Sequence, residues 1–404
     1  MDFSLEETQQ AVARLAAEVL HQGRPPAPHA DADAARGAGP EGTLSSLGIP
    51  QTPMAQDPLA VPGDVNEDGY DWALWKELGQ AGLLSLALPA ELGGDGLGVM
   101  DVAVLLTEVG RRAASVPALA TLVLGVLPVV RWGDRDLQQV LLAGVAAGDA
   151  VLTAAVREPS DVMPQVPATT ARLADRSGTV SGVKVGVPYA AAADWILVPA
   201  SLASGVTRVV IVEKSASGVS LRRTPSASGE PEYTLRLDEA PVAHVLGGAY
   251  AGGRVLTDLY QLALAGACCL ADGALAAALA LTTAHVASRQ QFGRPLAAFQ
   301  AVAQQIADVY IASRTLHLAA LSACWRLQAG LEAGDDLDVA AYWLAEQAPA
   351  ALMTCHHLHG GIGMDVSYPL HRYSSLVRDL VRFVGGAEYR LDRLGATVGA
   401  DAAS

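Results

Sequence analysis

The spacing of apolar and polar positions divides the chain into three zones. Residues 3–20 and 71–147 carry the period of amphipathic and apolar helices. Between 150 and 238 the period shortens to that of β-strands, and beyond about residue 252 it returns to that of helices. This order predicts an α+β protein with an N-terminal helical domain, a middle β-domain and a C-terminal helical bundle, over residues 1–149, 150–248 and 249–404.

Short runs of strand-forming residues make up the middle zone, separated by clusters of Gly, Pro and Ser. No helical pattern alternates with them, so a small antiparallel β-domain is expected rather than parallel βαβ units. The runs cover residues 150–156, 168–174, 179–184, 194–200, 207–213, 219–224 and 232–238.

Two stretches depart from an ordinary amphipathic pattern. Residues 21–64 are rich in Pro, Gly and Ala and have no period, which predicts a flexible surface insert within the N-terminal domain. Residues 259–289 form an Ala-rich, almost uncharged helical run that must be buried nearly all round. So much apolar helix predicts that part of the C-terminal bundle faces another subunit.

Composition narrows the function classes. The net charge of −15 argues against a nucleic-acid partner. The sequence has no unbroken run of about 20 apolar residues, so no membrane span is predicted. The acidic N-terminus does not have the pattern of a signal peptide, and the four cysteines have no disulfide or metal spacing. His356, His357 and His359 also lack zinc spacing. We therefore expect reduced thiols, no metal and a cytoplasmic location.

Three segments, taken together and in this order, resemble the acyl-CoA dehydrogenase family. They are ELGQAGLLSLALPAELGGDGLG, SRQQFGRPLAAFQAVAQQIADVY and LHGGIGMDVSYPLHRYSSLVRD, which begin at residues 77, 288 and 358. The resemblance covers nearly the whole chain except the insert. It implies FAD as cofactor, α,β-dehydrogenation of an acyl-CoA thioester, and a fold in which a β-barrel separates a helical domain from a four-helix bundle.

The second segment carries the strongest implied cofactor contact. The resemblance assigns Arg289 to the FAD of a neighbouring subunit, and a guanidinium suits pyrophosphate because it donates two parallel hydrogen bonds. The alternative is a charge that answers the helix macrodipole. Phe292 is implied to lie near the adenine, Gly293 permits the tight turn, and Gln291 and Gln300 complete the motif. For Gln300, core packing or a helix cap remains an alternative.

The third segment contains His359, Gly360 and Gly361, which the resemblance places against the dinucleotide across a dimer interface. A glycine pair lets a backbone approach a ligand closely, although a plain helix stop explains the glycines equally well. Pairing with the Arg289 motif favours the cofactor role.

The catalytic base of the family is missing from both of its usual positions. A thioester α-proton is a weak acid, so its removal needs a positioned carboxylate. Gly385 and Gly386 stand where one family pattern has Glu, and Ala263 stands where the other has it. Glu388 is the nearest substitute base, but it falls about one helical turn further on. Asp365 and Asp272 are weaker candidates.

The implied isoalloxazine side is altered as well. The family commonly has Thr-Glu before the flavin and, further on after a Gly-x-Lys, Trp-Ile followed by Thr or Ser, whose hydroxyl bonds the flavin edge. Here Arg157-Glu158 replaces the first pattern, and Gly186, Val187 and Pro188 replace the second. Pro188 has no N–H to offer. The pyrophosphate half of the site is therefore kept while the ring half is degraded.

These losses predict a subunit that completes the FAD site of a catalytic paralogue, in an α2β2 heterotetramer. The stretch after Tyr368-Pro369 resembles the two-subunit, steroid side-chain-like members of the family. An acyl-CoA substrate and an electron-transfer acceptor are the other expected partners. Three alternatives stay open: a homotetramer that uses a base such as Glu388, a related flavin oxidase or monooxygenase, and a scaffold subunit without flavin.

Overall fold

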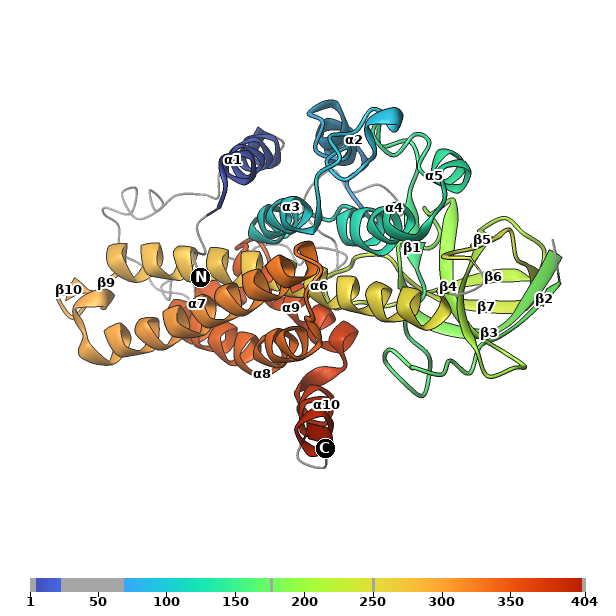
Figure 1. The fold of residues 1–404 in the computed structure, drawn as a ribbon. Coiled ribbons are helices and arrows are strands. Elements are labelled where there is room, and N and C mark those ends of the chain that lie inside the picture. The colour runs from blue at the N-terminus through green and yellow to red at the C-terminus, as the bar shows by residue number, and fades with distance from the viewer. Residues whose placement is uncertain (1–4, 23–68, 175–176, 249–250, 402–404) are drawn as a thin grey trace, which may run out of the picture.

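The computed structural model describes residues 5–22, 69–174, 177–248 and 251–401. Helices lead into a sheet and the chain then returns to helices, which confirms the three-zone prediction (Figure 1). The predicted insert lies outside the described residues, apart from residues 21 and 22, which end the first helix.

The N-terminal helices pack over the bundle on one side of the molecule (Figure 1). The second of them begins where the pattern predicts, because the Asp71 carboxylate accepts a hydrogen bond from the Leu74 N–H at 2.9 Å. A π-helical stretch, η4, interrupts the apolar run before α4. The elements are α1 (Glu7–Gln22), α2 (Trp72–Gln80), η3 (Ala90–Leu92), α3 (Val99–Arg112), η4 (Leu119–Val126), α4 (Leu127–Trp132) and α5 (Arg135–Leu141).

The middle zone folds into one eight-stranded sheet, in the order β6-β7-β3-β2-β4-β5-β8 with β1 also on β4. The sheet is mixed, so the expectation of a purely antiparallel domain is wrong. β1 and β2 lie end to end along one edge of β4, and both run parallel to it. The strands are β1 (Leu152–Ala154), β2 (Thr170–Ala174), β3 (Ser177–Pro188), β4 (Trp195–Leu202), β5 (Thr207–Glu213), β6 (Val219–Thr224), β7 (Glu232–Pro241) and β8 (His244–Val245).

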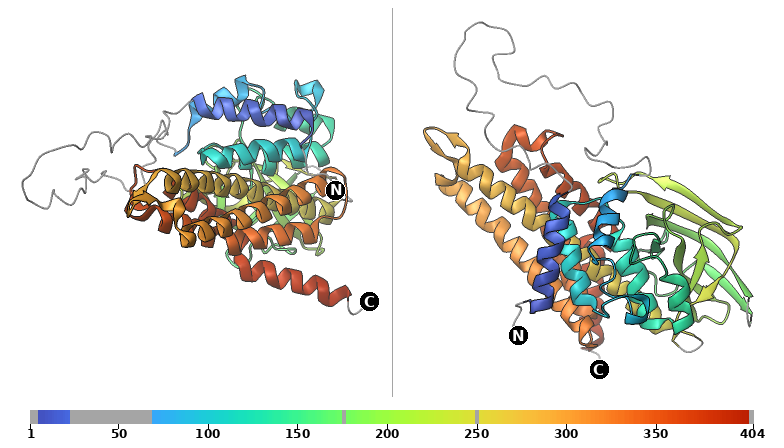
Figure 2. Two further views of the ribbon diagram at one scale, coloured as in Figure 1. Left: turned by 90° about the vertical axis from the view of Figure 1, so that its left-hand side faces the viewer. Right: turned by 90° about the horizontal axis from the view of Figure 1, so that it is seen from above.

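Long antiparallel helices form the C-terminal bundle, and α10 extends away from it (Figure 2). A two-residue hairpin and the short helix η5 join the first two long helices. The elements are α6 (Gly252–Ser288), β9 (Gln290–Gln291), β10 (Arg294–Pro295), η5 (Leu296–Ala298), α7 (Gln300–Gln328), α8 (Gly334–His359), η6 (Gly360–Met364), α9 (Leu370–Val384) and α10 (Gly386–Asp401).

The helix α6 is the axis of the molecule, about 55 Å long. It runs from the sheet to the β9–β10 hairpin at the opposite end (Figures 1 and 2). It is the one described helix whose length and composition would suit a membrane span, but 83% of its most apolar window is buried inside the protein, as in a core helix. Glycines let α3 pack closely on it: a Cβ at Gly110 would lie 2.1 Å from the Leu270 carbonyl oxygen.

Candidate cofactor site

Arg289 stands at the C-terminal end of α6, where the helix gives way to the hairpin. Its backbone N–H donates to the His285 carbonyl at 2.8 Å, and its own carbonyl accepts from the Leu296 N–H at 2.8 Å. The helix end and the hairpin base thus hold the Arg289 backbone in place. Its side chain is exposed, so the guanidinium is presented at the surface.

Phe292 and Gly293 form the tip of the hairpin. Both have positive φ angles, 52° and 78°, as a two-residue turn of the tight hairpin type requires. Glycine adopts this conformation freely, but for phenylalanine it costs about 1–2 kcal/mol. Phe292 is also 91% exposed. Among the described residues its ring pairs with one other aromatic ring, that of Phe299, in an edge-on arrangement with 6.2 Å between centroids. A strained, exposed aromatic side chain is typical of a residue that meets a ligand or a partner.

The end of α8 lies beside the end of α6. His359 closes α8, and its ring stacks on that of His285 with 4.5 Å between centroids and 19° between planes. Its Nδ1 donates to the Cys355 carbonyl at 2.8 Å, and its Nε2 lies 3.0 Å from the Tyr368 hydroxyl. Burial, together with the smaller effects of the neighbouring His359 and Arg289, lowers the pKa of His285 to about 4. The stack joins the two predicted cofactor motifs.

The glycines that follow His359 leave open space above the backbone. Gly360 has a φ of 63°, and a Cβ built on Gly360 or Gly361 would meet no atom within 4 Å. Gln291 in β9 and Gln300 at the start of α7 are both exposed. The structure therefore brings the predicted residues to one end of the bundle, and all except His359 face outward. Their contacts with a dinucleotide remain predictions.

The backbone at the position expected for the catalytic base has a left-handed conformation that favours glycine. Gly385 and Gly386, between α9 and α10, have φ angles of 95° and 83°. Ala263 is fully buried within α6. Glu388 lies in the first turn of α10 and is exposed.

The two weaker base candidates have structural partners. The Asp365 carboxylate accepts hydrogen bonds from the N–H and the hydroxyl of Ser367, at 2.8 Å and 2.7 Å. Asp272 lies 2.9 Å from Nδ1 of His317, between α6 and α7. Neither of them lines the cavity between the sheet and the helices described below.

Glu158, which stands with Arg157 in place of the Thr-Glu pattern, belongs to the framework of the sheet. Its carboxylate accepts from the N–H groups of Ala168 and Thr169 at 2.7 Å and 2.9 Å, and from the Lys184 ammonium at 2.7 Å. Both charged side chains are buried. Burial lowers the pKa of Lys184 to about 8, and Glu158 offsets part of that effect. Burial alone would raise the pKa of Glu158, but the Lys184 hydrogen bond and charge lower it overall.

Arg157 occupies the space over Gly186, where the family pattern has the flavin-facing aromatic residue. A Cβ at Gly186 would lie 2.8 Å from one Arg157 amino nitrogen and 3.3 Å from one of Arg382. Arg382 in turn donates to both oxygens of Glu232 at 2.7 Å. Asp379 accepts from the same guanidinium at 3.2 Å. This charged cluster ties the sheet to α9.

The cavity beside this cluster is too small for a flavin ring. It lies between α3, η4, α6, α9 and the sheet and encloses about 50 Å³, whereas ligand pockets commonly measure roughly 300–1,000 Å³. Tyr189, with a φ of 53°, and Glu230 form part of its wall. Burial raises the pKa of Glu230 to about 8, and the charges of Asp379 and Glu232 add to the rise. Glu230 is consequently protonated at neutral pH.

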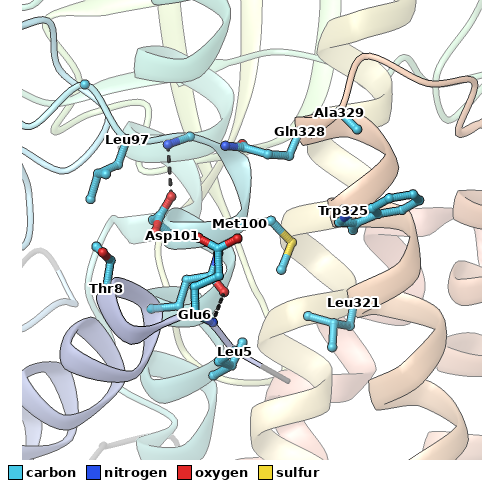
Figure 3. A pocket seen from close by; sticks show the side chains of 13 residues that line it. Leu5, Glu6, Thr8, Leu97, Met100, Asp101, Leu321, Trp325, Gln328 and Ala329 are labelled. Atoms are coloured by element: carbon cyan, nitrogen blue, oxygen red, sulfur yellow. Dashed lines mark hydrogen bonds between the residues drawn. The ribbon is translucent and has the colours of Figure 1, made fainter. Parts of the chain in front are cut away.

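A further pocket lies away from the predicted cofactor residues. It measures about 390 Å³ and lies between the start of α1, the start of α3 and the C-terminal end of α7 (Figure 3). Asp101 lies in its wall and accepts from the Gly98 N–H at 3.1 Å (Figure 3). Along α7 this end is about 40 Å from Gln300. The loop ending at Gly98, which the resemblance places near an acyl cavity, lines this pocket and not the one beside the sheet.

The residues that sequence reasoning missed are His285, Arg382 and Glu230. His285 precedes Arg289 by one helical turn, so helical spacing alone places it on the same face. For Arg382 and Glu230 no local signal exists, since both act through contacts with distant segments. Among the described residues, no group of three or more His, Cys, Asp or Glu side chains could hold a metal ion.

Comparisons with known proteins agree with this architecture. Residues 55–149 match the family description "Acyl-CoA dehydrogenase, N-terminal domain", and residues 255–398 match "Acyl-CoA dehydrogenase, C-terminal domain". The acyl-CoA dehydrogenase FadE28 of Mycobacterium tuberculosis is 50% identical over 327 residues, covering 80% of this chain and 91% of that protein. FadE27 of the same organism is 32% identical, covering 82% and 89%.

Solved structures extend the likeness to nearly the full length. The Tcur3481–Tcur3483 steroid ACAD (G363A variant) superposes with a TM-score of 0.83 at 32% identity, covering 98% of this chain and 99% of that one. The ChsE4–ChsE5 complex of Mycobacterium tuberculosis also gives a TM-score of 0.83, at 29% identity and 99% coverage of both chains.

Proposed function

The chain belongs to the acyl-CoA dehydrogenase family, and we propose that it supplies the pyrophosphate-binding half of an FAD site whose ring half belongs to a catalytic paralogue. FAD is the cofactor of the family, and when bound it takes up the hydride that leaves the β-carbon of the acyl thioester. In this proposal the α-proton is removed by the paralogue, because this chain has no carboxylate at either family position.

One observation carries the proposal: two arginine side chains lie over Gly186 at the sheet end of this chain, while the hairpin end keeps an outward-facing arginine motif. The β9–β10 hairpin is at one end of α6, and the sheet is at the other (Figures 1 and 2). One flavin cannot bridge a helix about 55 Å long. At the sheet end, a Cβ on Gly186 would meet nitrogens of Arg157 and Arg382, so in this proposal no ring is bound there. At the hairpin end, Arg289 and the open backbone of Gly360 are presented outward.

Apolar side chains near Arg289 support a second chain at this end. Phe292 at the hairpin tip is 91% exposed, and Met364 in η6 is 77% exposed. Ile362 and Val366 beside it are also exposed. Exposed apolar residues gathered around a cofactor motif are typical of a surface that another subunit covers. The two similar solved structures are each named as a pair of proteins, which supports a paralogous partner and an α2β2 assembly.

Each residue at the hairpin end then has a defined task. Arg289 donates its paired N–H groups to the pyrophosphate, and the backbone at Gly360 and Gly361 approaches the dinucleotide closely. Phe292 covers an apolar part of the dinucleotide or of its binding wall. The likeness to a protein described as a steroid ACAD supports a bulky, steroid-like acyl-CoA as the substrate of the complex.

Purification with and without the paralogue tests the proposal. The chain alone should lack the visible absorbance of bound flavin and should give no bleaching with acyl-CoA, whereas the co-purified complex should show both. A chain that binds FAD alone and is reduced by a thioester would contradict the half-site and would favour a base such as Glu388. A complex that forms without flavin would favour a scaffold subunit.

A further inference from the structure

Two buried cysteines from different helices contact each other. Cys269 lies in α6 and Cys324 in α7, and their sulfur atoms are 3.6 Å apart. A disulfide has a sulfur–sulfur distance of about 2.05 Å, so the pair must approach by about 1.5 Å to bond. Small rotations about the two Cα–Cβ bonds can supply a movement of this size.

Free volume beside the pair makes that movement feasible. A cavity of about 90 Å³ is lined by both cysteines and by the Asp272–His317 pair. The His317 side chain is 30% exposed, so the wall of this cavity extends to the protein surface. Hydrogen peroxide is close to water in size, and a space of this volume is several times what one water molecule needs.

We propose that Cys269 and Cys324 form an oxidant-sensitive site, at which hydrogen peroxide links α6 to α7 through a disulfide. One thiol loses its proton, and its sulfur attacks a peroxide oxygen. The O–O bond breaks, giving a sulfenic acid and a hydroxide that takes up the proton as water. The second thiol then attacks the sulfenic sulfur and a second water leaves. Two thiols are oxidised to one disulfide while one peroxide is reduced to two waters.

The contact between the two sulfur atoms distinguishes Cys269 and Cys324 from the other cysteines. The pKa of Cys269 is raised well above its ordinary value, first by its hydrogen bond with the Cys324 sulfur and then by burial. Cys268 and Cys355 are also buried, but among the described residues neither sulfur lies within hydrogen-bond distance of another cysteine sulfur. Cys268 is the residue before Cys269 on α6, so its side chain leaves the helix about 100° further round the axis.

Peroxide treatment of the folded protein tests the site. After oxidation the protein is denatured with an alkylating reagent, and the free thiols are counted by intact mass. Two of the four cysteines should escape alkylation. The disulfide itself lowers the mass of the chain by about 2 Da through the loss of two hydrogens, and a reductant should reverse both changes. Peptide mapping should recover one cross-linked pair that contains Cys269 and Cys324.

Matched variants identify the pair. Cys324→Ser should abolish the protection, and Cys355→Ser, which removes a buried thiol from α8, should leave it intact. The linked protein should melt about 5 °C higher, because the bond closes a loop of about 55 residues in the unfolded chain. Four alkylated cysteines after treatment of folded protein, or a cross-link between other cysteines, would overturn the proposal. Mapping of the unmutated chain decides the question even if Cys324→Ser does not fold.

Discussion

Replacement of Arg289 by alanine probes the proposed half-site most directly. The side chain is exposed at the end of α6 in the single chain, and a second subunit would enclose it together with the pyrophosphate. A charge-assisted contact in such a partly dry interface contributes about 1.5–3 kcal/mol. Its loss should weaken FAD retention by the assembled complex about ten- to a hundredfold. Arg289→Lys should give an intermediate loss, since it keeps the charge but not the paired donors.

The assay is release of FAD from the assembled complex on serial dilution, followed by flavin fluorescence. Arg222→Ala removes the same charge from an exposed position on β6 and should leave retention unchanged. Because Arg289 ends a helix and is exposed, Tm should change little. An Arg289→Ala complex that keeps its full flavin load where the unmutated complex begins to lose it would refute the reasoning. The residue would then serve only as a helix-end charge.

Further predictions concern the framework of the site. Gly385→Ala should cost about 1–2 kcal/mol of unfolding free energy, because φ is 95° and the Cβ would lie 2.8 Å from the Tyr389 ring. Gly361→Ala places its Cβ in open space and should cost much less. Equal urea midpoints for the two variants would contradict this prediction. Lys184→Met should cost about 3–5 kcal/mol, because it leaves the buried Glu158 carboxylate unpaired, and adding Glu158→Gln should recover part of the loss in the same titration. His285 has a folded pKa of about 4, below the ordinary 6.5, so the unfolded chain binds more protons between these values and stability falls as pH drops from 6.5 towards 4. His285→Phe keeps a stacked ring and should flatten that fall in Tm; an unchanged pH profile would count against the assignment.

Local signals were sufficient for most of the architecture. The change from helical to strand period placed the three zones, and Asp71 marked the start of α2, because periodicity and caps depend on residues close in sequence. The parallel pairing of β1 and β2 with β4 was missed, since it depends on which strands the fold brings to one edge. The two-residue strand β8 is too short to have a period.

The residues of the candidate site also divide into those that local sequence could predict and those that depend on distant segments. The motif around Arg289 could be identified because its residues are contiguous, and the absent base could be noticed because a family position holds glycine. The Arg157 side chain over Gly186 and the stack of His285 on His359 could not, because each joins segments far apart in sequence. The pairing of Cys269 with Cys324 depends likewise on the register of α6 against α7.

The glycine turn between α9 and α10 has an evolutionary consequence. A glutamate returned to Gly385 by a single mutation would meet a left-handed backbone, and Arg157 would still fill the ring position. Under the proposed half-site, each reverting step on its own would therefore lower stability without restoring turnover. Selection acts on single steps, so such a lineage has no gradual path back to independence. The gene for this chain and that of its paralogue should accordingly be inherited, and lost, together.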